Sequence, residues 1–213
     1  MIALSIFNSV RRVLALGAHS DDIEIGLGGT LLQALAANPD LEVYWVVFAA
    51  PGPRTAEAQA SAEEFLAGTA RKRIRVLSFR ESYFPSDWDR IKDSFETIRT
   101  TFTPDLVFTH YRDDRHQDHR VLSDLAWNTF RDHLILEYEI PKYDGDFGTP
   151  NVFVPLSEFV VDLKIKLLMK HFETQRLKRW FMASTFEAVM RIRGVEAASP
   201  CAEAFYCRKM VLG

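Results

Sequence analysis

The sequence predicts an α/β protein with a mostly parallel, doubly wound sheet flanked by helices and a smaller C-terminal subregion over the functional site. Short apolar runs, such as residues 13–16 and 106–108, alternate through most of the chain with longer segments whose apolar residues recur at helical spacing. Apolar runs without polar alternation are typical of parallel strands covered on both faces. The chain has 213 residues and is 47% hydrophobic, which indicates one core and one domain over residues 1–213.

The first elements are delimited by glycine and proline. Residues 13–16, bounded by Gly17, predict a buried strand. Leucines at helical spacing predict a helix over residues 25–37, which ends at Asn38-Pro39. The elements that follow are a strand over residues 41–49, a helix over residues 56–66 with Thr55 as its N-cap, and a strand over residues 74–79.

The later elements follow the same rules. Ser86 and Asp89 resemble a capping box, and the helix that they begin ends before Pro104. Residues 141–150 have the polar and turn-forming composition of a loop that could contact a substrate. The remaining predicted elements are strands over residues 106–109, 134–139 and 204–212, and helices over residues 119–130, 157–180 and 186–192.

Composition excludes several classes of protein. The net charge is −3 and the basic stretch at residues 71–75 is short, so nucleic acid is not an expected partner. No run approaches the length of a membrane span, and the N-terminus lacks the pattern of a signal peptide. Two cysteines, Cys201 and Cys207, are expected to be reduced. These features predict a cytoplasmic protein, and they leave open whether it is a homo-oligomer.

Two clusters of metal-compatible residues follow two of the predicted strands. His19, Asp21 and Asp22 come after the first strand, and the cluster His116-Gln117-Asp118-His119 comes after the strand at residues 106–109. Parallel strands bring their carboxyl ends to one edge of a sheet, where open α/β sheets bind ligands. The two clusters are therefore expected to meet and to form a catalytic zinc site with one open position for water.

Each residue of the clusters can be given a role. We expect His19, Asp22 and His119 to hold one zinc ion, because His19 and Asp22 lie three residues apart across a tight turn. Asp21 then remains free to act as the general base. Two alternatives remain: another divalent metal takes the place of zinc, or both aspartates are ligands in a dinuclear site.

The second cluster supplies further catalytic groups. His116 is expected to stabilise an oxyanion or to protonate a leaving amine, and Asp118 to keep His116 charged and oriented.

The alternative to a catalytic role for the first cluster is that Asp21 and Asp22 only cap a helix. His110, His133 and His171 lack a partner motif and are expected to be core or surface residues.

The glycines after the acidic turn do not form a dinucleotide-binding motif. Gly26, Gly28 and Gly29 come too late, since the strand-to-helix turn itself holds Asp21 and Asp22, whose charges would repel phosphates. The glycines are expected to allow close packing of a helix on the sheet.

These motifs resemble those of the LmbE-like or PIG-L family of zinc-dependent N-deacetylases. The matching residues are Ala18-His19-Ser20-Asp21-Asp22 with Gly28-Gly29, and His116-Gln117-Asp118-His119. Ser20 departs from the usual proline, which loosens the turn but removes no ligand. The resemblance implies a Rossmann-like fold, zinc at His19, Asp22 and His119, and Asp21 as general base.

The resemblance also implies a substrate, namely an N-acetylated amino sugar or glycoconjugate as a small-molecule partner. Arg54 and Tyr143 are candidates to contact it, with Lys142 beside Tyr143, although a loop arginine and an ordinary surface loop are the alternatives. Two other functions stay open. One is a metal-dependent amidase that acts on a non-sugar or thiol-conjugate amide, and the other is a non-catalytic Rossmann-like binding module.

Overall fold

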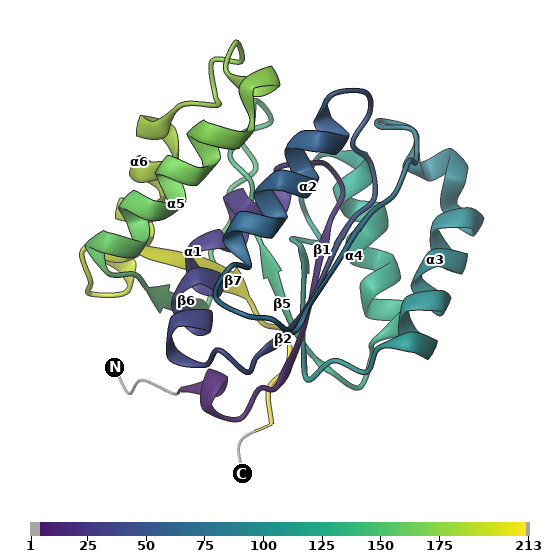
Figure 1. The fold of residues 1–213 in the computed structure, drawn as a ribbon, viewed down its shortest axis with the longest axis horizontal. Coiled ribbons are helices and arrows are strands. Elements are labelled where there is room, and N and C mark those ends of the chain that lie inside the picture. Colours follow the sequence, from purple (N-terminus) through teal and green to yellow (C-terminus); the bar gives the residue numbers. More distant parts are fainter. Residues whose placement is uncertain (1–4, 212–213) are drawn as a thin grey trace.

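The computed structural model describes residues 5–211, and within them a seven-stranded sheet lies between two layers of helices (Figure 1). This confirms the predicted α/β class. The strand order in the sheet is β3-β2-β1-β4-β5-β7-β6. The strands are β1 (Arg12–Gly17), β2 (Glu42–Val47), β3 (Lys72–Val76), β4 (Leu106–His110), β5 (Leu134–Tyr138), β6 (Val152–Pro155) and β7 (Ala202–Tyr206).

The chain reverses its direction of winding at β1, and this point positions the site. β1 pairs in parallel with β2 on one side and with β4 on the other, so that Ala15 lies between Trp45 and Phe108. The connections after β1 and β4 therefore leave the sheet side by side. Such a switch point is where doubly wound sheets bind ligands.

The helices cover the two faces of the sheet. The face shown on the right of Figure 1 is covered by α3 (Trp88–Thr101) and α4 (Gln117–Thr129). The other face is covered by α1 (Asp22–Ala37), α2 (Arg54–Phe65), α5 (Glu158–His171) and α6 (Ala183–Glu196). None of these helices is long and apolar enough to span a bilayer, within the residues described.

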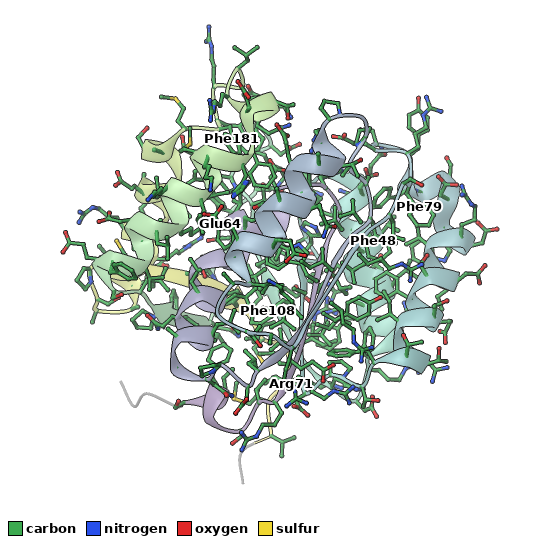
Figure 2. All side chains as sticks on the ribbon, viewed as in Figure 1. Phe48, Glu64, Arg71, Phe79, Phe108 and Phe181 are labelled. Atoms are coloured by element: carbon green, nitrogen blue, oxygen red, sulfur yellow. The ribbon has the colours of Figure 1, made fainter. Side chains whose placement is uncertain are left out.

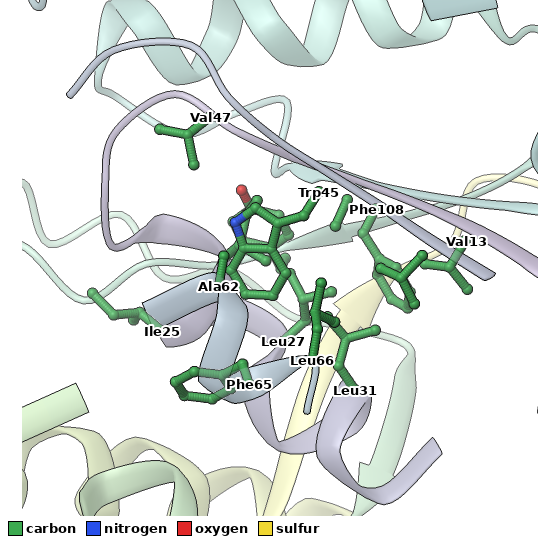
Figure 3. Close-up of a cluster of buried hydrophobic side chains, with 14 of the residues drawn as sticks. Val13, Ile25, Leu27, Leu31, Trp45, Val47, Ala62, Phe65, Leu66 and Phe108 are labelled. Atoms are coloured by element: carbon green, nitrogen blue, oxygen red, sulfur yellow. The ribbon is translucent and has the colours of Figure 1, made fainter. Parts of the chain in front are cut away.

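Each layer has its own apolar core. Between the sheet and α1 and α2, Trp45 packs on Phe65 with ring centroids 6.3 Å apart, beside Leu27 and Leu31 (Figure 3). On the opposite face, Phe48 stacks on Phe79 and on Phe95, and Figure 2 shows Phe48 and Phe79 on the α3 side. Burial of each such ring contributes on the order of 2 kcal/mol, so both cores stabilise the sheet that carries the site.

The glycines of α1 allow that helix to pack closely on the sheet and on α2. A Cβ atom on Gly26 would lie 2.2 Å from Cδ2 of Tyr138, and one on Gly28 would lie 2.7 Å from Cε1 of Phe65. Side chains larger than hydrogen would push the helix outward. The predicted close packing of the helix on the sheet is confirmed at Gly26, whereas Gly28 allows α1 to approach α2.

Several predicted boundaries are wrong. The predicted helix over residues 157–180 ends at His171, in a last turn where Lys170 and His171 bind Glu64 of α2, and a 3₁₀ helix (Glu173–Gln175) follows. β6 was not predicted. The capping box is absent: Asp87 occupies the N-cap position of α3, after a 3₁₀ helix (Phe84–Asp87), and its side chain makes no capping hydrogen bond.

The other strands and helices differ from their predicted ranges by shorter shifts. Thr55 lies inside α2, whose N-cap is Pro53, and its hydroxyl donates instead to the carbonyl of Ala50. The predicted last strand ends at Tyr206 rather than at residue 212, and Leu212, like residues 1–4 of the predicted N-terminal segment, lies outside the described residues.

Candidate active site

The loops after β1 and β4 meet, and they bring the three predicted metal ligands together. Nδ1 of His19 lies 3.2 Å from Nε2 of His119 and 3.4 Å from Oδ2 of Asp22. Nε2 of His119 lies 3.6 Å from Oδ2 of Asp22. All three side chains are buried.

This donor triangle has the dimensions of a metal site. Ligand atoms about 2.0–2.1 Å from a tetrahedral zinc ion lie about 3.3 Å from one another. Two overlapping groups of donor atoms also lie within 4.8 Å of one another, and they are His19, His116 and His119, and Asp22, His110 and His119. The residues present therefore fit a divalent metal, and His119 is common to both groups.

A second carboxylate stands behind each imidazole. Nε2 of His19 lies 3.1 Å from Oδ2 of Asp118, and Nδ1 of His119 lies 2.9 Å from Oδ2 of Asp114. Ligand histidines in metalloproteins have such partners, which fix the ring and its tautomer. Here they leave Nδ1 of His19 and Nε2 of His119 to face the common point.

Asp118 does not orient His116, in contrast to the prediction. Its carboxylate accepts the N–H groups of Ser82 (2.6 Å) and Phe84 (3.2 Å), which hold it against His19. The N–H of Asp118 instead donates to Nδ1 of His116, which caps α4. His116 therefore carries its proton at Nε2 when neutral. Burial lowers the pKa of His116, and the neighbouring His19 lowers it further.

His110 is a core residue, as predicted, but it also belongs to this cluster. It is fully buried at the end of β4, with Nε2 3.2 Å from Oδ2 of Asp22 and 3.0 Å from the N–H of Ala18. Its ring stacks on His119 with centroids 3.9 Å apart. Its position at the carboxyl end of a central strand could have indicated from the sequence that it belongs to the site.

The other two histidines lie outside the cluster. His133 pairs with Asp132, and His171 pairs with Glu64. The sequence did not predict Asp114, because a single aspartate in a polar loop matches no motif. Only its position five residues before His119 could have indicated the contact.

Asp21 and Asp22 have different surroundings. Oδ2 of Asp22 accepts the N–H of His19 at 2.7 Å, which closes the turn. Asp21 occupies the N-cap position of α1, but its side chain makes no capping hydrogen bond. Its Oδ2 is buried without a hydrogen-bond partner among the described residues. Capping alone does not explain this pair.

The pKa of Asp21 is raised from its usual value to about 6. Burial is the main cause and the charge of Asp22 adds to it, while Arg54 acts in the opposite direction. Nη2 of Arg54 lies 3.5 Å from Oδ1 of Asp21, its Nη1 lies 2.5 Å from Glu81, and its Nε donates to Ser20 at 2.9 Å. Arg54 thus fixes Asp21 from the start of α2.

A pocket opens above these groups. Tyr143 lies at its rim and is 75% exposed, and Lys142 binds Asp114 at 2.9 Å and so ties the rim to His119. The residues that line the pocket are His19, Asp21, Asp22, Arg54, Glu81, His116, His119, Ile140, Lys142, Tyr143, Asp144, Gln175, Lys178 and Trp180.

The family model of PIG-L, described as GlcNAc-PI de-N-acetylase, matches residues 14–130, which is more than half of the chain and includes both site loops. The chain belongs to the PIG-L family. Enzymes of this family are deacetylases, hydrolases that act on amides, so the predicted resemblance is confirmed.

Similar proteins include other deacetylases. A curated relative in the Escherichia coli K12 strain, named uncharacterized deacetylase YaiS, is 29% identical over 182 residues, covering 79% of this chain and 94% of the relative. The solved N,N'-diacetylchitobiose deacetylase from Pyrococcus horikoshii has a TM-score of 0.72 and 21% identity, over 94% of this chain and 85% of that one.

The same fold also carries a different reaction. The 4-carboxy-2-hydroxymuconate hydratase GalB from Pseudomonas putida KT2440 matches with a TM-score of 0.72 and 16% identity, over 95% of this chain and 98% of that one. At these identities the solved structures show the shared fold alone. The chemistry of this PIG-L family member must be argued from its own residues.

Proposed function

We propose that the protein is a zinc-dependent hydrolase that removes the N-acetyl group from an amino sugar or glycoconjugate. The observation that carries the proposal is the donor triangle of His19, Asp22 and His119 with the unbonded Oδ2 of Asp21 beside it. Three ligands and one uncommitted carboxylate are what hydrolysis of an amide by an activated water requires.

A zinc ion held by this triangle would lower the pKa of a bound water to about 7 and polarise the amide carbonyl. Asp21 accepts the proton that the attacking water loses, through Oδ2. Its raised pKa suits both this step and return of the proton to the leaving amine. Arg54 holds the other oxygen, Oδ1, so that Oδ2 stays directed to the reacting group.

His116 acts as a hydrogen-bond donor to the carbonyl oxygen as negative charge develops there. Its Nδ1 already accepts the N–H of Asp118, so Nε2–H is the group free to donate. A neutral imidazole can perform this role. Of the two roles predicted for His116, this geometry favours oxyanion stabilisation, and Asp21 then protonates the amine.

At the rim, Tyr143 is the group we propose to contact the sugar, since it is exposed and lines the pocket. Arg54 is bound by two carboxylates of the chain, so we assign it to orienting Asp21 rather than to the substrate.

Both cysteines are free, which supports a reducing, cytoplasmic location.

The second candidate is an amidase of the same mechanism that acts on a different amide, because the catalytic groups do not themselves select a sugar. A panel of N-acetylated amino sugars, sugar conjugates and non-sugar amides, with free amine as the readout, separates the two. We expect amine release from sugar members, and Asp21→Asn as control should abolish most of it. Release only from non-sugar amides would favour the second candidate, and no release from any metal-loaded sample would contradict both.

A further inference from the structure

The segment between α5 and α6 forms one wall of the pocket, and nothing in the catalytic account uses it. Three of its residues line the pocket, namely Gln175, Lys178 and Trp180. It is well anchored. Thr174 donates to Glu57 of α2 through its N–H (2.9 Å) and its hydroxyl (2.6 Å).

An aromatic cluster holds the other end of this segment. Phe181 is buried between Phe172 and Phe186, with ring centroids 6.2 and 5.2 Å away. Figure 2 shows Phe181 near the ends of α5 and α6, at the edge of the molecule opposite the termini. The wall is therefore fixed to the scaffold at both ends, as a binding surface should be.

Gln175 has a hydrogen-bond acceptor to offer. Its side chain is 2% exposed, and its Nε2 donates to Oγ1 of Thr174 at 3.0 Å. Because the hydroxyl of Thr174 donates its proton to Glu57, its Oγ1 can only accept a hydrogen bond from Gln175. The amide atom that faces Oγ1 is therefore Nε2 and not Oε1. Oε1 then remains buried without a hydrogen-bond partner among the described residues. Such a group is unfavourable unless something supplies a donor.

Lys178 has a charge to offer. Three cations line the pocket, and two of them are engaged by carboxylates: Arg54 by Glu81 and Asp21, and Lys142 by Asp114 and Asp146. Within residues 5–211, Lys178 has no carboxylate within 4 Å, and its Nζ lies 5.6 Å from the centre of the Trp180 ring. Its charge therefore remains available at the mouth of the pocket.

We propose that Gln175, Lys178 and Trp180 form a subsite for an anionic sugar conjugate. A phosphate or carboxylate of the conjugate pairs with Lys178, a sugar hydroxyl donates to Oε1 of Gln175, and the carbon skeleton packs on Trp180. This subsite rests on the proposed deacetylase function and narrows its substrate class to sugars with a negative charge outside the reacting amide.

The test compares kcat/KM for a neutral N-acetylglucosamine methyl glycoside, N-acetylglucosamine 1-phosphate and a carboxymethyl glycoside. We expect an anionic substrate to be preferred, and Lys178→Met to lower the ratio of anionic to neutral kcat/KM roughly five- to ten-fold through KM. Lys178→Arg should retain the ratio, as should Lys166→Met, which removes an exposed charge of α5 outside the pocket. The preferred anion distinguishes phosphate from carboxylate. An unchanged ratio in Lys178→Met would overturn the proposal.

Gln175→Met tests the buried acceptor. If Oε1 serves a sugar hydroxyl, this variant should raise KM roughly ten-fold while Tm falls by no more than a few degrees, because the only internal hydrogen bond of the side chain that is lost is the one from Nε2 to Thr174. A fall in Tm with KM unchanged would show a purely structural role.

Binding separates failure of the subsite from failure of the proposed function. Calorimetry with N-acetylglucosamine 1-phosphate and the full-length Asp21→Asn protein does not depend on turnover. Weaker binding after the added Lys178→Met substitution supports the subsite even if no sugar is deacetylated. Equal binding with and without Lys178 refutes it, whatever the activity.

Discussion

Nε2 of His19 lies 3.1 Å from Oδ2 of Asp118, ninety-nine residues further along the chain. This contact joins the loop after β1 to the start of α4. It also turns Nδ1 of His19 toward Asp22 and His119. The carboxylate of Asp118, from the second motif, thus orients His19, the metal ligand that we propose from the first motif.

Replacing the outer carboxylates should weaken metal binding without removing a ligand. Asp114→Asn and Asp118→Asn should each lower metal affinity by about 10- to 100-fold, because the imidazoles lose the partners that fix their rings. Competition with a chromogenic chelator measures this. Asp113→Asn, an exposed neighbour of Asp114, is the matched control and should bind metal normally.

Replacing His110 should lower turnover, whereas replacing His133 should not. His110 contacts Asp22 and His119, so His110→Gln should lower turnover at least about 10-fold by disturbing both proposed ligands. His133→Gln alters a surface pair and should leave the rate near that of the unmodified enzyme. Equal rates in the two variants would show that His110 is only a packing residue.

The buried ion pair of Lys164 and Glu203 should stabilise α1. Nζ of Lys164 donates to the carbonyl of Ile25, and Glu203 accepts the N–H groups of Gly29 and Thr30. Lys164→Met leaves a buried charge unpaired, so unfolding in urea should show a loss of about 3–5 kcal/mol. Lys72→Met breaks a more exposed pair with Glu63 and should cost at most about 1 kcal/mol. Similar losses in both would contradict the argument.

Local patterns were sufficient to predict the two site loops and every strand of the sheet except β6. Apolar runs place β1 and β4, and their parallel pairing then brings His19, Asp22 and His119 together. Contacts between distant segments were beyond that reasoning. The helix predicted over residues 157–180 ends at His171, where its last turn contacts Glu64 of α2, and the periodicity of the segment does not indicate this contact.

The same limit applies to the site. Asp118 was assigned to His116 from their closeness in sequence, but backbone N–H groups of Ser82 and Phe84 direct it to His19. Gln175 and Lys178 line the pocket from a segment more than fifty residues after the second motif, so no local sequence pattern indicated that they would belong to the site.

The central claim is the division of roles between adjacent aspartates, and metal stoichiometry measured together with turnover tests it most directly. Asp21→Asn and Asp22→Asn are matched isosteric variants. By mass spectrometry of purified protein, Asp21→Asn should keep about one divalent ion per chain, as we also expect of the unmodified enzyme, and lose most activity. Asp22→Asn should lose most of the metal along with activity. Metal loss in Asp21→Asn equal to that in Asp22→Asn, or full turnover by Asp21→Asn, would contradict the account.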